Sequence, residues 1–286
     1  MILYEWPRAA AFGRVIPKNK IYEHASANTA LKDLFVREVD QIIWSHKLAP
    51  ETVNLAATKQ VAEIQIFRIT ARTATLDRDV LRAIDKAIPF PLIFELVHGN
   101  RVKLVAAYKR PNEADSSRWV VGDYFEGDWL LEDVSRAPLP VALNLGALYE
   151  RLLSPLVERQ TARLILGSGE PTLVVPVAPT SQVEPVSLET RIAQAEALKA
   201  KTREVDRIKG RLAREKQFNK RVAINAELRA AKQELDQLTA GTAGVTAAME
   251  AHANASASLR SQDVARVVDA FRGASYQSGE KGASDP

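Results

Sequence analysis

The 286-residue sequence contains no cysteine, which excludes disulfide bonds, thiolate metal sites and a cysteine nucleophile. This absence suits a reducing compartment, so we expect a cytoplasmic protein. No apolar run approaches the ~20 residues that a membrane helix needs. Residues 1–14 also lack the apolar core of a secretory signal.

Short motifs that carry chemistry are missing as well. The sequence has neither a GxxxxGK[ST] phosphate loop nor a GxGxxG fingerprint after a predicted strand, and it has no GxSxG nucleophile elbow. The four histidines, His24, His46, His98 and His252, share no metal-ligand spacing. We therefore expect no cofactor and no metal, and the residues alone name no reaction.

The composition is ordinary for a globular chain, but the positive charge is unevenly distributed. Between residues 199 and 221, ten basic residues face only three acidic ones. Such a patch is typical of phosphate contact, and also of the solvated face of a coiled coil, where Lys and Arg pair with Glu. The candidate nucleic-acid-binding residues in this patch are Arg203, Arg207, Arg211, Arg214, Lys216, Lys220 and Arg221.

Residues 1–160 have the pattern of an α+β body, in which helices pack on a small mixed sheet. In chain order the pattern predicts a helix from residue 29 with Asn28 as its N-cap, strands over 41–48 and 61–70, a helix over 76–88, a hairpin of strands 91–97 and 101–109, a strand over 119–126, and a helix over 144–154. We expect Pro155 to interrupt or end this last helix, because proline lacks the N–H that a helix interior uses.

The rest of the chain divides into a proline-rich linker over residues 161–186, a basic amphipathic segment over 187–240 and a disordered tail over 241–286. In the middle segment apolar residues recur every three or four positions, as one helix face requires. This spacing predicts a long coiled-coil-like helix, or a helical hairpin that bends where Phe218 and Asn219 interrupt the apolar stripe.

An apolar stripe of this length needs a surface to cover it. We expect another protein to do so, and the residues chosen as partner-binding are Leu212, Phe218, Val222, Leu228 and Leu235. Self-association as a coiled-coil scaffold is one alternative. The sequence does not decide whether the segment packs on its own chain.

A second basic segment lies near the N-terminus. Lys18 and Lys20 precede Tyr22, and basic residues beside an aromatic ring are typical of phosphate contact or base stacking. A surface turn whose Tyr22 packs on the body explains the same pattern. Both lysines are therefore candidate nucleic-acid-binding residues.

One set of polar residues has the order of a nuclease core. Metal-dependent DNA cleavage uses two carboxylates on adjacent strands to hold Mg²⁺, with a lysine nearby. Asp40 opens one predicted strand, and Glu63 and Gln65 share a face of the next. Lys86 follows on the helix after it. Gln65 stands where the lysine is needed and carries no charge, so a polar strand face is the simpler explanation and a divergent Mg²⁺-dependent nuclease the alternative.

Several blocks of sequence together resemble the bacterial family DUF4391 over residues 12–240. They are residues 14–23 (RVIPKNKIYE), 34–38 (LFVRE), 42–54 (IIWSHKLAPETVN), 63–67 (EIQIF), 80–91 (VLRAIDKAIPFP), 124–129 (YFEGDW), 214–222 (REKQFNKRV) and 225–229 (NAELR). The resemblance implies a companion of DNA methyltransferases and helicases in restriction-like or phage-defence gene sets. It supplies no catalytic residues.

These observations together favour a non-catalytic accessory subunit of a DNA restriction-modification or phage-defence-like system. Such a subunit would dock a methyltransferase or helicase and contact DNA through its basic residues, away from any membrane. The nuclease and the self-associating scaffold remain the alternatives.

Overall fold

The computed structural model describes residues 3–115, 118–166 and 187–240, so the predicted tail and most of the predicted linker lie outside the described residues. The chain divides into two compact units. One holds the sheet, its helices and residues 188–200, and the other holds residues 201–240. The mixed α and β class predicted from the sequence is confirmed. In the part of the chain that the structure describes, no helix has the length and apolarity to cross a membrane.

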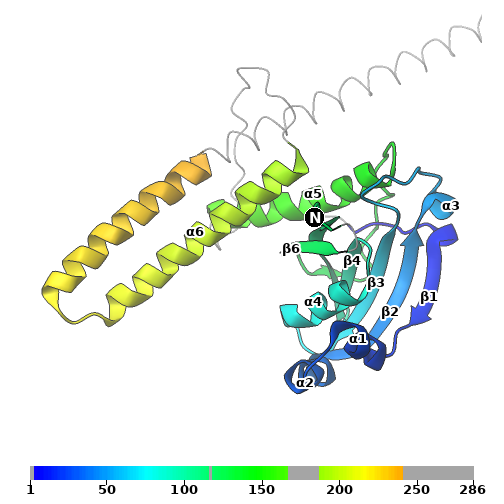
Figure 1. Ribbon diagram of the computed structural model, residues 1–286, viewed down its shortest axis with the longest axis horizontal. Helices are drawn as coiled ribbons and strands as arrows, with labels where there is room; N and C mark the ends of the chain where they lie inside the picture. Colours follow the sequence, from blue (N-terminus) through cyan, green and yellow to red (C-terminus); the bar gives the residue numbers. More distant parts are fainter. Residues whose placement is uncertain (1–2, 116–117, 167–186, 241–286) are drawn as a thin grey trace, which may run out of the picture. The chain divides into compact units, whose positions relative to one another are not determined.

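A seven-stranded sheet forms the centre of the first unit (Figure 1). Its strands are β1 (Ala11–Val15), β2 (Val39–Leu48), β3 (Ile64–Ala71), β4 (Leu92–His98), β5 (Arg101–Pro111), β6 (Trp119–Glu126) and the short β7 (Leu130–Leu131). Strands β1 to β6 lie in sequence order, and β7 pairs with β5. Strands β3 and β4 pair in parallel because α4 (Arg78–Ala87) connects them, and the other five pairings are antiparallel.

Successive strand residues point to opposite sides of the sheet, and both of its faces are buried. Ile66 and Phe67 enter different core clusters, and so do Ile93 and Phe94. On one face pack α1 (Lys18–Ala25), α2 (Thr29–Glu38) and α4. Asn28 caps α2 as predicted, since its side chain accepts a hydrogen bond from the Leu31 N–H at 2.9 Å.

The opposite face is covered by the N-terminal segment, including the 3₁₀ turn η1 (Arg8–Ala10), by α5 (Leu145–Leu166) and by the start of α6 (Leu188–Arg214). A short helix, α3 (Pro50–Val53), follows β2. Glu95 of β4 is buried on this face of the unit. It accepts hydrogen bonds from the Trp6 indole at 2.8 Å and from Arg136 at 2.7 Å. These bonds attach the N-terminal segment to the sheet.

The prediction that Pro155 interrupts or ends its helix is wrong, because α5 continues through Pro155 to Leu166 and crosses the boundary expected at residue 160. The residues just after the proline explain the continuation. Leu156 and Val157 are buried in the core, and each contributes about 1.5–3 kcal/mol by leaving water. That gain offsets the hydrogen bond that proline cannot donate. The Ser154 hydroxyl also donates to the Glu150 carbonyl at 2.8 Å.

The first part of the predicted apolar stripe packs on the chain's own sheet unit. Leu188, Ile192 and Ala195 of α6 are buried in the core beside α5. Polar contacts fix the same stretch to β6, where Glu196 accepts from the Asp123 N–H at 3.3 Å and Lys199 pairs with the Asp123 carboxylate at 2.6 Å. A backbone N–H of β6, the last strand in the sheet order, is thereby satisfied within the chain.

The second unit is a helical hairpin, which is one of the two arrangements predicted from the sequence. The hairpin consists of residues 201–214 of α6, a break at 215–217 and a helix over 218–240 that folds back alongside (Figure 1). Its seam buries Val205 and Ile208 against Ile224 and Ala231. Most of the apolar stripe is therefore covered within the chain, whereas Phe218 and Val222 stay exposed.

Candidate functional site

The hairpin carries a row of arginines on the side opposite its apolar seam. Val205 and Ile208 point toward the second helix. With about 3.6 residues per turn, Arg203, Arg207 and Arg214 fall together on the far face of α6. All three are exposed, and none forms an ion pair with the described residues. The arginine row spans roughly 16 Å at ~1.5 Å per residue.

Three more cations surround the break between the two helices. Lys216, Lys220 and Arg221 are exposed and form no ion pair with the part of the chain that the structure describes. Glu215 is engaged locally, because its carboxylate accepts from the backbone N–H groups of Gln217 at 2.8 Å and Lys216 at 2.9 Å. The bond from Gln217 is the main reason that the pKa of Glu215 is lowered, with the charge of Lys220 assisting. This end of the hairpin is thus strongly positive.

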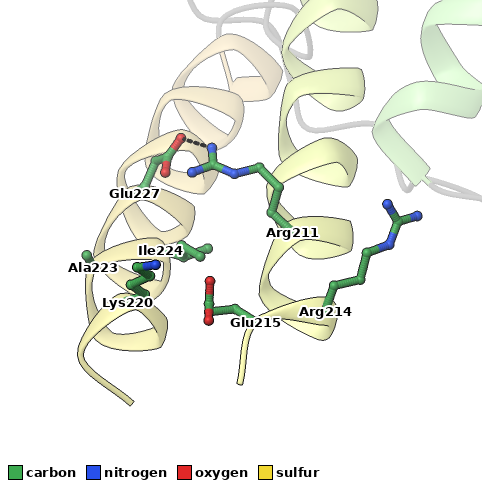
Figure 2. Close-up of a pocket in the computed structure, with 7 residues that line it drawn as sticks. All are labelled: Arg211, Arg214, Glu215, Lys220, Ala223, Ile224 and Glu227. Carbon is green, nitrogen blue, oxygen red and sulfur yellow. Dashed lines mark hydrogen bonds and ion pairs between the residues drawn. The ribbon is translucent and has the colours of Figure 1, made fainter. Parts of the chain in front are cut away.

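Arg211 behaves differently from the arginine row. Its guanidinium reaches across to Glu227 of the second helix at 2.9 Å, while Arg214 points away from that helix (Figure 2). Arg211, Arg214 and Glu227 line a cleft of about 460 Å³, together with Glu215 and Lys220. The ion pair between Arg211 and Glu227 links the two helices at their surface. That Arg211 binds nucleic acid stays a prediction.

The residues chosen as partner-binding fall into two groups. Leu212, Leu228 and Leu235 pack against the hairpin seam and are half-buried there, so they do not form a free surface. Phe218 and Val222 lie just after the break and remain 77% and 54% exposed. They form an apolar patch of two residues beside the cations of the hairpin end.

The two N-terminal lysines, both in α1, make different contacts. The Lys18 ammonium donates to the main-chain carbonyls of Val39 at 2.5 Å and Phe35 at 3.2 Å, where α2 passes into β2. Burial lowers the pKa of Lys18. It is therefore a structural contact of the helix end and not a free phosphate ligand. Lys20 is exposed and pairs with Glu23 at 3.1 Å.

The proposed nuclease residues do not come together. Strands β2 and β3 are antiparallel, with Val39 opposite Ala71 and Lys47 opposite Gln65. Asp40 and Gln65 therefore lie near opposite ends of the pair, roughly 23 Å apart at ~3.3 Å per residue. Asp40 pairs instead with Arg72 at 3.1 Å.

The remaining members of that set also have other partners. Glu63 accepts from the Gln65 amide and pairs with Lys47 at 3.1 Å. Lys86 donates to the carbonyl of Ala25 in α1 at 3.3 Å. Among the described residues, no group of three or more acidic or histidine side chains is placed to hold a metal ion.

A buried polar cluster of the sheet unit centres on Lys109 of β5. Its side chain is fully buried, and the ammonium donates to the carbonyls of Asp85 and Ile88 at 2.5 Å each and lies 3.4 Å from the Asp85 carboxylate. The Tyr124 hydroxyl donates to the other oxygen of Asp85. The Trp119 ring lies 5.8 Å from the ammonium. Lys109 thus joins the end of α4 to the sheet.

Burial is the first cause of the pKa shifts in this cluster. It lowers the pKa of Lys109 and raises the pKa of Asp85, while the attraction between the two opposes both shifts. Burial and the nearby Asp85 raise the pKa of Tyr124, which stays protonated. From the other face, the Tyr149 hydroxyl accepts from the Lys109 N–H at 3.0 Å and donates to the Ala107 carbonyl at 2.8 Å, at an irregularity in the β5–β6 register.

A family model that matches most of the chain shows which protein family it belongs to. The family model described as "Domain of unknown function (DUF4391)" matches residues 5–235. The chain belongs to this family. No curated protein and no solved structure matches it. The DUF4391 match extends from the N-terminal segment into the second helix of the hairpin, so both compact units are parts of the family's domain.

The Lys109 cluster of this DUF4391 chain was not predicted from the sequence, although one signal was present. In β5, Val105 and Ala107 point to the same face as Lys109 and are fully buried. An alternating strand therefore places Lys109 on a buried face, where a charged residue needs a partner. The partners Asp85 and Tyr124 come from α4 and β6, and no spacing in the sequence connects them.

Proposed function

We propose that this chain is a non-catalytic accessory subunit of a DNA restriction-modification or phage-defence-like system. In this proposal the arginine row on the outward face of α6, with the cations at the hairpin end, contacts DNA phosphates, while the protein serves a methyltransferase or helicase partner. The sheet unit is the scaffold that carries α6, and through it the hairpin.

The observation that carries the proposal is the arginine row. Three exposed arginines share one outward face of α6, without carboxylate partners among the described residues. Arg211, by contrast, is paired with Glu227. Guanidinium groups match phosphate oxygens in a bidentate manner. Their span of roughly 16 Å corresponds to about five base-pair steps of ~3.4 Å each.

The exposed Phe218 and Val222 favour a protein contact at the same end of the hairpin. A large aromatic side chain at 77% exposure leaves water only when something covers it, and such residues are frequent anchors of interfaces. In the proposal this patch meets the methyltransferase or helicase. The nuclease alternative is not favoured, because the fold separates Asp40 from Glu63 and Gln65.

The test is binding of a fluorescent duplex of about 30 base pairs to the full chain, followed by anisotropy across a series from about 50 to 200 mM salt. We expect the logarithm of the binding constant to fall linearly with the logarithm of the salt concentration. The variant Arg203→Gln/Arg207→Gln/Arg214→Gln should bind at least about tenfold more weakly at the lowest salt concentration. Its salt slope should be smaller by roughly one for each phosphate that the variant no longer neutralises.

A matched control removes the same charge elsewhere. Lys59, Arg101 and Arg151 are exposed residues of the sheet unit without an ion pair among the described residues. Their joint replacement by Gln should leave both affinity and slope close to wild type. Equally weak binding by the two variants would show that net charge alone drives binding, and this would overturn the assignment to the arginine row.

A further inference from the structure

A cleft of about 500 Å³ lies where the end of α4 meets the start of β6. From α4 and the residues after it come Arg82, Asp85, Lys86, Ile88 and Pro89, and from the other side come Arg118, Trp119 and Val121. Within α4, residues 82, 85 and 86 are three and four positions apart, so they share one face of the helix. The volume is within the range of roughly 300–1,000 Å³ found for small-ligand sites.

Cations dominate the rim of this cleft. The side chains of Arg82 and Arg118 are 59% and 80% exposed. Their carboxylate contacts are loose or local, since Arg82 lies 4.0 Å from Asp123, and Arg118 pairs with the nearby Asp115 at 3.2 Å. Lys86 adds a third positive charge, and since its ammonium donates one hydrogen bond to the Ala25 carbonyl at 3.3 Å, two of its three N–H groups are left for a ligand. Such partners leave guanidinium N–H groups able to donate to an anionic ligand.

The floor and one wall are apolar and aromatic. Ile88, Pro89 and Val121 supply aliphatic surface, and the half-buried Trp119 supplies an indole. The one carboxyl in the cleft, Asp85, is already occupied by Lys109 and Tyr124. Its repulsion of an anion is therefore reduced.

We propose that this cleft binds a mononucleotide, with the base against Trp119 and the phosphates on Arg82, Lys86 and Arg118. An aromatic wall accepts any planar base by stacking, and a cluster of arginines and a lysine is the usual recognition set for phosphate. A simple anion would use the rim but not the indole or the apolar floor. This site does not rest on the proposed function of the hairpin.

The full chain is titrated by calorimetry with ADP, with adenosine and with inorganic pyrophosphate. We expect saturable binding of one ADP per chain, and at least about tenfold weaker binding of adenosine and pyrophosphate, since each lacks one half of the contacts. Absence of saturable ADP binding overturns the proposal. Pyrophosphate that binds as tightly as ADP also overturns it, because the cleft would then be an anion site only.

Variants of the chain test whether ADP binds in this cleft. Arg82→Gln/Arg118→Gln changes two exposed side chains, so the fold is retained, and ADP affinity should fall at least about tenfold. Trp119→Phe keeps an aromatic ring above Lys109. Because this variant lacks the indole, the quenching of tryptophan fluorescence that ADP causes at Trp119 should be lost. The control Lys59→Gln/Arg151→Gln should bind ADP like wild type. So should the arginine-row variant, which separates this site from the hairpin. Unchanged ADP affinity in Arg82→Gln/Arg118→Gln would place the ligand elsewhere.

Discussion

Lys109 shows how one residue can join three elements. Its ammonium occupies the end of α4, where the carbonyls of Asp85 and Ile88 need donors. A cation at a helix C-terminus also interacts favourably with the helix dipole. The Asp85 carboxylate balances the charge from α4, and Trp119 of β6 adds its ring. A neutral side chain of the same volume would fill the space but leave these oxygens without donors.

We therefore predict that Lys109→Met lowers the free energy of unfolding by about 3–5 kcal/mol, the usual cost of removing one partner of a buried pair. Urea denaturation followed by circular dichroism measures it. The exposed Lys59→Met is the control and should shift stability by less than about 0.5 kcal/mol. Adding Asp85→Leu to Lys109→Met should recover part of the stability, because no uncompensated carboxyl remains. An unchanged midpoint for Lys109→Met would contradict the structural role given to the ammonium.

At the scale of elements, the sequence predicts well those segments whose own periodicity decides the outcome. Strands β2 and β3 follow from alternation, and the β4–β5 hairpin follows from its short turn, where Gly99 has a φ of 60°. The end of α5 does not follow from local pattern. Pro155 is a helix breaker by propensity, and burial of Leu156 and Val157 in the tertiary core overrides it.

The candidate site was predictable only in part. The excess of arginine in residues 203–214 is visible in the sequence, but which arginines remain unpaired depends on the position of Glu227 across the hairpin. Likewise, the periodicity of the stripe does not reveal what covers it. The same spacing suits a partner protein, a second copy or a returning helix.

The hairpin seam is small, so its stability should respond strongly to a single truncation. Ile208 is 2% exposed, and Ile208→Ala should cost about 2–5 kcal/mol. A two-helix unit has little stability to spare, because isolated helices are marginal in water. Hydrogen exchange should show reduced amide protection over residues 201–240 and unchanged protection in β2 to β5. Val222→Ala, at an exposed position, should leave exchange unaltered. Protection that persists in Ile208→Ala would show that the seam does not hold the hairpin.

At the scale of the whole molecule, the expected surface for a partner protein is no longer the apolar stripe, because most of the stripe packs within the chain. Leu188, Ile192 and Ala195 pack on the sheet unit, and Val205, Ile208, Ile224 and Ala231 pack within the hairpin, so most of the stripe needs no partner to cover it. What remains exposed at the hairpin end is the pair Phe218 and Val222, next to Lys220 and Arg221. An accessory subunit of the proposed kind therefore uses neighbouring but separable surfaces for protein and for DNA.

This separation gives the last prediction. Phe218→Ser/Val222→Ser should weaken binding to the proposed methyltransferase or helicase partner by at least about tenfold, because a buried aromatic anchor typically contributes about 2 kcal/mol or more. Its affinity for the DNA duplex should stay within about twofold of wild type, since every phosphate-binding cation is retained. The arginine-row variant should show the reverse: weak DNA binding and unchanged binding to the partner. Surface plasmon resonance with each immobilised ligand measures both. If Phe218→Ser/Val222→Ser binds the partner as wild type does, the hairpin end serves DNA alone, and the accessory subunit docks through another surface.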